Sequence, residues 1–175
     1  ERKQKEMNQQ EFLVFIEPIK DKMYRLSVRL LVSKEAAQDA VQEVFVKLWN
    51  KRDTLKKYDN AHAFAMTVTK NHCLDQLKLK KNNNLRIVHS NYEDESKSLQ
   101  KQLEAKNELE IVAEIIKDLS EQEQTLIQLR DIEQLEYEEI IEITGMKPTA
   151  IRVGLSRARK KIRKEIIKKH RYGTV

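Results

Sequence analysis

The chain has 175 residues, of which 39% are hydrophobic and 35% are charged, and it contains three Gly and two Pro. This length suits one domain or two small ones, and the scarcity of Gly and Pro favours helices. A single cysteine, Cys73, excludes an internal disulfide framework, and no apolar run reaches the ~18 residues that span a bilayer. Because no signal peptide opens the sequence, we expect a cytoplasmic protein without direct membrane insertion.

Charge is distributed unevenly around the net value of +6. Residues 109–144 hold 2 Lys/Arg against 11 Asp/Glu, whereas residues 145–175 hold 11 against 1. A concentrated cationic segment attracts polyanions, nucleic acid first. A basic tail kept for solubility is the alternative, although this segment is also patterned like a helix.

The first predicted helices fill residues 9–80. Apolar residues recur at helical spacing over 9–32, where Pro18 is expected to kink the helix or to start a new one. Ser33 is a good N-cap for an amphipathic helix over 33–50. Residues 51–60 lose the periodicity and are expected to form a loop, and the helical pattern returns over 61–80. Cys73 lies within that pattern and is expected to be a small buried side chain.

Residues 81–100 are polar and aperiodic, which is typical of a linker. We therefore expect an all-α fold of two small helical domains, over 8–80 and 105–170, joined by a flexible linker over 81–104. In the second domain one helix carries Leu109 to Leu119, and Ser120 with Glu123 forms a capping box for the next. Further helices are expected over 136–144 and 149–169.

The last two helices match a helix-turn-helix. Gly145 can take a left-handed turn at little steric cost, Met146 is expected at a buried turn position, and Pro148 with Thr149 suits a helix start. The second helix of this motif enters the major groove, where Lys and Arg contact phosphates and base edges. The residues expected to contact duplex DNA are Lys147, Thr149, Ala150, Arg152, Val153, Ser156, Arg157 and Lys160. An ordinary charged surface helix is the alternative.

A polar stripe marks the helix over 33–50. Asp39, Gln42, Glu43 and Val46 fall at i, i+3, i+4 and i+7, opposite the core face. The residues alone would be explained by a solvated helix face.

A second polar surface combines the loop at 51–62 with the helix that follows it. Cations and an aromatic ring can hold single-stranded DNA by charge and stacking, although a solvated loop has the same composition. The loop contributes Lys56, Lys57, Tyr58 and Asn60. The helix contributes a stripe with Lys70, Asn71, Asp75 and Lys78.

Three stretches together resemble the extracytoplasmic-function sigma factors of the sigma-70 family. Residues 36–50, AAQDAVQEVFVKLWN, resemble region 2 through Asp39, Gln42, Glu43 and Phe45. Residues 61–81, AHAFAMTVTKNHCLDQLKLKK, resemble the block that follows, with Asn71 among the matches. Residues 119–162 resemble region 4. The three motifs occur in the family's order, and that order is more specific than any one of them.

The resemblance implies a protein that directs RNA polymerase to promoters. The stripe from Asp39 to Val46 would dock on the clamp helices of the polymerase β′ subunit, with further contact to the β subunit. The loop and the Asn71 helix would capture a base flipped from the minus-ten element, and the helix-turn-helix would bind the minus-thirty-five duplex. An anti-sigma factor would hold the protein inactive.

Two other classes of function are compatible with parts of this sequence. A stand-alone dimeric helix-turn-helix regulator would bind a palindromic operator without polymerase. A nucleic-acid enzyme such as a resolvase would need a nucleophile or a metal cluster. The four His and Cys73 show no ligand spacing and no Gly-rich phosphate loop occurs, so we expect no enzyme activity, no metal and no cofactor.

Overall fold

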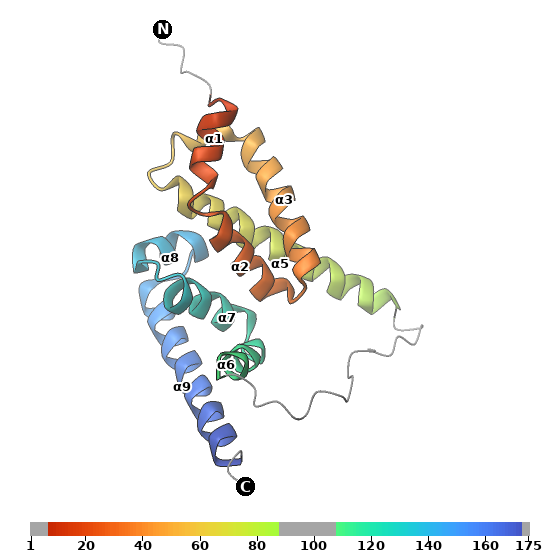
Figure 1. Ribbon diagram of the computed structural model, residues 1–175, viewed down its shortest axis with the longest axis vertical. Coiled ribbons are helices and arrows are strands. Elements are labelled where there is room, and N and C mark those ends of the chain that lie inside the picture. Colours follow the sequence, from red (N-terminus) through yellow and green to blue (C-terminus); the bar gives the residue numbers. More distant parts are fainter. Residues whose placement is uncertain (1–6, 88–107, 173–175) are drawn as a thin grey trace.

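The computed structural model describes residues 7–87 and 108–172, and every regular element in these ranges is a helix (Figure 1). The expected all-α fold is confirmed. Within the described residues, none of the helices combines the length and apolar character that crossing a membrane requires.

The N-terminal bundle consists of α1 (Gln9–Ile16), α2 (Lys20–Leu31), α3 (Lys34–Asn50), α4 (Arg52–Leu55) and α5 (Ala61–Ile87). Pro18 separates α1 from α2, as expected, because its ring cannot continue the α1 hydrogen bonds. The Ser33 hydroxyl caps α3 by accepting a hydrogen bond from the Ala36 amide at 3.2 Å. Two boundaries differ from the prediction: the expected loop contains the single turn α4, and α5 continues past residue 80 to Ile87.

Helices α2, α3 and α5 pack against one another and enclose the apolar core of this bundle. The predicted core positions Met23, Leu26, Val44 and Leu48 are fully buried. Cys73 is also buried, as expected, with its Sγ 3.5 Å from the Ser27 hydroxyl, and burial raises the pKa of its thiol. Cys73 is therefore a packing residue.

The C-terminal bundle consists of α6 (Glu108–Lys117), α7 (Glu121–Ile127), the π-helical turn η1 (Gln128–Ile132), α8 (Tyr137–Thr144) and α9 (Pro148–Tyr172). The predicted capping box of Ser120 and Glu123 begins α7. Gly145 ends α8 in the left-handed region, with a φ of 68°, and α9 begins at Pro148. Met146 in the turn is half-buried rather than buried, because its thioether packs at the surface against Gln122, an exposed side chain whose amide donates to the sulfur at 3.2 Å.

Gly154 lies where α9 meets α7. A Cβ atom at this position would lie 2.6 Å from Cδ1 of Leu126, a fully buried side chain of α7. The glycine therefore permits a close approach of the α9 backbone to α7.

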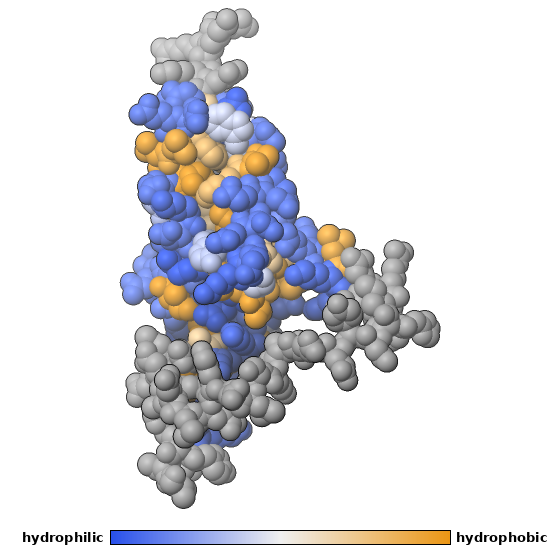
Figure 2. Space-filling view, turned by 45° about the vertical axis from the view of Figure 1, so that its right-hand side comes forward, coloured by the Kyte–Doolittle hydropathy of each residue, from blue (hydrophilic) through white to orange (hydrophobic). Residues whose placement is uncertain are grey.

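The two bundles lie against each other, with α7 and α8 beside α2 and α5 (Figure 1). Polar side chains dominate the face shown in Figure 2, and apolar residues form separate patches among them. Small, separate apolar patches are normal for a protein surface, so the candidate interfaces must be argued from particular residues.

Candidate polymerase and DNA interfaces

The predicted stripe on α3 is a solvent-facing surface. Asp39, Gln42, Glu43 and Val46 are all exposed, and Val46 shows 59% of its surface to solvent. On the other side of the helix Val44 and Leu48 are fully buried, and they fix the rotation of α3 about its own axis. We call these four exposed residues the α3 stripe. Two carboxylates around an exposed apolar side chain suit a protein partner that offers cations and a hydrophobic contact.

The loop between α3 and α5 borders an open pocket of about 410 Å³. Lys56, Tyr58 and Asn60 line it together with His62 at the start of α5. Met7 and Phe15 line it from the α1 side, a position that the sequence did not predict. The ring centroids of Phe15 and His62 are 5.1 Å apart, and Tyr58 stacks on Phe64 at 4.1 Å. The pocket thus has aromatic walls, and its lining includes one cation, Lys56, and one carboxylate, Asp59. Aromatic walls suit an unpaired nucleobase, and Lys56 suits its phosphate.

Most of the predicted minus-ten residues are accessible. Six of them are exposed: Lys56, Lys57, Tyr58, Asn71, Asp75 and Lys78. Two ion pairs lie among them, from Lys56 to Glu11 at 3.4 Å and from Lys78 to Asp75 at 3.7 Å. Both pairs lie at the surface, where such contacts are weak and can be exchanged for phosphate contacts.

The remaining two, Asn60 and Lys70, are half-buried under α8. The Lys70 ammonium donates to the Ile143 carbonyl at 2.8 Å, and the Asn60 amide donates to Glu139 at 3.5 Å. Ile143 lies in the last turn of α8, where carbonyls lack partners within the helix and attract cations. Burial lowers the pKa of Lys70. Both side chains therefore already have partners in the C-terminal bundle.

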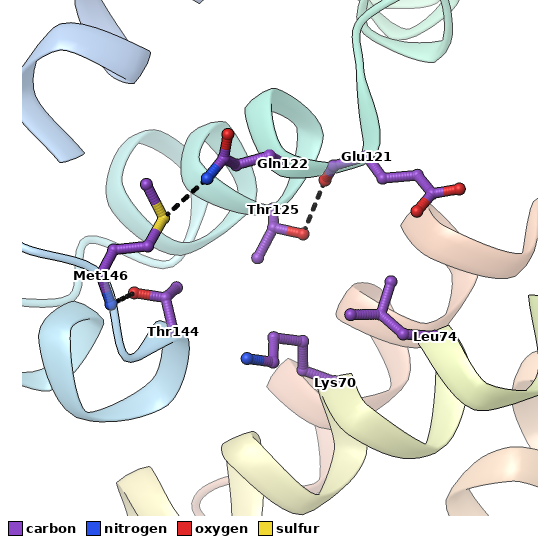
Figure 3. A pocket seen from close by; sticks show the side chains of 7 residues that line it. All are labelled: Lys70, Leu74, Glu121, Gln122, Thr125, Thr144 and Met146. Atoms are coloured by element: carbon purple, nitrogen blue, oxygen red, sulfur yellow. Dashed lines mark hydrogen bonds between the residues drawn. The ribbon is translucent and has the colours of Figure 1, made fainter. Parts of the chain in front are cut away.

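A cavity of about 240 Å³ lies beside this contact, and Lys70 and Leu74 of α5 face α7 and the end of α8 across it (Figure 3). Gln122 and Met146 close one side through their contact. The space shows that the two bundles are incompletely packed at this point, between residues that hold them together.

A partly buried ionic network holds α2 to the C-terminal bundle. Arg25 donates to both carboxylate oxygens of Glu133 at 2.7 Å, and Gln128 donates to the same carboxylate at 2.9 Å. Arg29 in turn donates to Gln128 at 3.3 Å. Glu133 is only 7% exposed, and these partners replace the water that its carboxylate oxygens would otherwise bind. No sequence motif distinguished Arg25 or Arg29 from ordinary surface cations of an amphipathic helix.

The predicted DNA-contacting residues lie just before α9 and along one face of it, and this face is exposed to solvent. All eight of its residues are exposed: Lys147, Thr149, Ala150, Arg152, Val153, Ser156, Arg157 and Lys160. We call this set the recognition face. Ile151, Leu155 and Ala158 are fully buried on the other side and orient the helix.

Two further contacts shape the cations of α9. The Arg152 guanidinium lies 5.6 Å from the centroid of the Tyr137 ring. This cation–π contact restricts the conformations of the Arg152 side chain. Arg159 donates to Asp131 at 3.0 Å and so ties α9 to η1. Hydrogen bonding to Asp131 raises the pKa of Arg159. Arg159 is thus a structural cation, whereas Arg152 and Arg157 face solvent.

Comparison with known proteins identifies the family. The model of sigma-70 region 2 matches residues 15–82, and a model of sigma-70 region 4 matches residues 109–162. These matches cover both helical bundles. The chain belongs to the sigma-70 family of transcription initiation factors.

Two solved structures share the fold. The sigma factor RpoE from Bartonella quintana, crystallised with the anti-sigma factor NepR, matches with a TM-score of 0.74 at 20% identity, over 90% of this chain and 97% of RpoE. CnrH, in complex with the cytosolic domain of CnrY, matches with a TM-score of 0.66 at 17% identity, over 92% of this chain and 90% of CnrH. No curated protein sequence matches the chain.

Proposed function

We propose that this sigma factor binds core polymerase through the α3 stripe and reads the promoter with two separate surfaces. Residues 8–80 would form the polymerase and minus-ten unit, residues 105–170 the minus-thirty-five unit, and residues 81–104 the connection. The single observation that carries this assignment is that the α3 stripe and the recognition face are both exposed while the opposite faces of their helices are buried. A stand-alone regulator would leave the region 2 match unexplained.

Docking on polymerase is tested by gel filtration of the chain with core RNA polymerase. The wild type should co-elute, and the double variant Asp39→Lys/Glu43→Lys should not. Glu17→Lys/Asp21→Lys is the matched control, because it makes the same change of net charge at exposed positions outside the stripe. Co-elution of all three would move the contact away from α3, and failure of the wild type would overturn the polymerase assignment.

The minus-ten surface would hold one unpaired base in the pocket beside Tyr58 and the adjoining phosphates on Lys56, Lys57 and Lys70. Unstacking a base costs a few kcal/mol, so the pocket must return that free energy through stacking and hydrogen bonds. The aromatic walls of the pocket support this role, with Asn71 and Asp75 further along the α5 surface.

We infer that the free protein must open before it binds the minus-ten strand. Asn60 and Lys70 cannot contact DNA while they are bonded to Glu139 and to the Ile143 carbonyl. The acidic segment 109–144 would thereby cover cations of the N-terminal bundle. An anti-sigma factor would act on this protein by stabilising the arrangement that cannot bind DNA. RpoE, which has the same fold, was crystallised with the anti-sigma factor NepR.

A further inference from the structure

A histidine lies directly beneath the α3 stripe and contacts it. His72 of α5 is 9% exposed. Its Nδ1 is 2.7 Å from the Lys47 ammonium, and its Nε2 is 3.4 Å from the Glu43 carboxylate. Lys47 and Glu43 are one helical turn apart on α3 and both are exposed. One ring from α5 thus connects two exposed charges on the surface proposed to bind polymerase.

The contacts of the ring define which of its two nitrogens carries the hydrogen. A lysine ammonium can only donate, so the Nδ1 atom that faces Lys47 must accept. A neutral imidazole has one acceptor nitrogen, so Nε2 carries the hydrogen and donates toward Glu43. The Gln76 carboxamide lies at the same edge, with its amide nitrogen 3.1 Å from the ring Nε2. Because that ring nitrogen already carries the hydrogen, the carboxamide must be turned about its last bond so that its oxygen accepts there. His72 in its neutral form therefore holds Lys47 by one edge and Glu43 by the other.

We propose that His72 is a positioning residue for polymerase binding, whose neutral imidazole holds Lys47 and the Glu43 carboxylate in the arrangement that α3 presents to polymerase. The inference rests on the proposed docking role of the α3 stripe. Long charged side chains lose rotamer freedom when they bind a partner, so fixing them in advance strengthens binding. The same arrangement makes docking depend on the proton of His72.

Protonation would dismantle the arrangement. A doubly protonated ring has no acceptor for Lys47 and repels its ammonium, while it attracts the Glu43 carboxylate inward and competes with the partner for it. The charged groups that face the ring are Lys47 and Glu43 of α3 and Asp75 of α5. Burial, followed by Lys47, lowers the pKa of His72 below 6.5, although Glu43 and Asp75 oppose this. Docking should therefore be complete at neutral pH. It should weaken as the pH falls below the ordinary pKa of a histidine side chain, about 6.5.

The test is the affinity of the labelled full chain for core polymerase at about pH 8 and about pH 5. We expect the wild type to bind several-fold more weakly at the lower pH, and His72→Gln to lose this dependence. Lys47→Met should weaken binding at the higher pH already. Lys34→Met is its matched control, the same change at an exposed position of the same helix, and should follow the wild type.

A second measurement reads the ring in the free protein. The ¹⁵N shifts of the His72 imidazole, assigned with His72→Gln, should show the Nε2–H tautomer at neutral pH, and Lys47→Met should change them. An Nδ1–H tautomer, or the same pH dependence in His72→Gln as in the wild type, would overturn the inference. If the wild type fails to bind at either pH, the docking role of the α3 stripe falls, and this inference with it. Loss of binding in Asp39→Lys/Glu43→Lys beside unchanged behaviour of His72→Gln overturns the inference alone.

Discussion

At the scale of the residue, single substitutions should distinguish the minus-thirty-five contact from the minus-ten contact. Arg152 is exposed on the recognition face and directed by the Tyr137 ring, so Arg152→Ala should weaken binding of minus-thirty-five duplex by roughly 1–3 kcal/mol if it reads a base. Lys164→Ala, further along α9, should weaken binding slightly and equally for all sequences. Fluorescence anisotropy with cognate and scrambled duplexes measures both, and equal losses on the two duplexes for Arg152→Ala would exclude base reading.

Asn71→Ala should act on the other DNA contact. Asn71 is exposed on α5 and remote in sequence from α9, so the variant should bind minus-thirty-five duplex normally. It should impair open-complex formation with core polymerase, measured with a fluorescent base in the minus-ten element. Unimpaired melting would remove Asn71 from the minus-ten surface.

Replacing Gly154 with alanine has two opposing effects on stability, a gain in helix propensity and a steric overlap in the core. Alanine improves helix propensity by about 1 kcal/mol over glycine, but its Cβ would meet Leu126 Cδ1 at 2.6 Å in the core. Overpacking a filled core typically costs about 1–3 kcal/mol, so Gly154→Ala should lower the free energy of unfolding by about 1 kcal/mol. Chemical denaturation measures it. The penalty should shrink in a Leu126→Val background, and an undiminished penalty would refute the steric explanation.

At the scale of the element, the end of α2 is strained. Val32 follows the helix with a φ of 63°, and a β-branched residue rarely occupies this left-handed region. Val32 is 63% exposed, so replacing it removes little packing. Val32→Gly should raise the free energy of unfolding by about 0.5–1 kcal/mol. Val14→Gly, an exposed valine inside α1, should lower it by a similar amount, and a loss in both variants would contradict the strain.

The helices themselves were predictable because local chemistry defines them. Ser33, Ser120, Gly145 and Pro148 each terminate or begin a helix through their own hydrogen bonds or backbone preference. Apolar spacing likewise predicted which sides of α3 and α9 are buried. The turn α4 and the extension of α5 to Ile87 were missed, because neither has an apolar period that distinguishes it from a loop.

At the scale of the whole molecule, the contacts between the bundles could not be predicted. Arg25 and Glu133 are 108 residues apart, and no local pattern pairs them. The same is true of Phe15 in the pocket and of His72 beneath the α3 stripe, where position in three dimensions rather than residue type gives the role. The sequence indicated surfaces that face solvent, and long-range packing determines which of those surfaces are occupied.

That packing predicts a closed free protein that Arg25→Glu should open. The variant removes both hydrogen bonds to Glu133, a carboxylate 7% exposed, and places a like charge against it. Breaking a fully buried pair costs roughly 3–5 kcal/mol. Because 48% of the Arg25 side chain is exposed to solvent, we expect a smaller cost of about 1–3 kcal/mol, which should still shift the molecule toward separated bundles. Small-angle scattering should show a larger radius of gyration, and a single-stranded minus-ten oligonucleotide should bind more tightly because Lys70 is released.

Two variants control for charge alone. Lys20→Glu makes the same change on α2, but its partner Glu17 lies within the N-terminal bundle, so neither the size nor the oligonucleotide affinity should rise. Arg25→Glu/Glu133→Arg restores an opposite-charge pair and should close the molecule again in part. If Arg25→Glu leaves both readouts at the wild-type values, the free protein does not depend on this pair for closure. The Arg25→Glu variant could instead open without binding the oligonucleotide more tightly. In that case the closed arrangement does not block promoter contacts by Lys70 and Asn60.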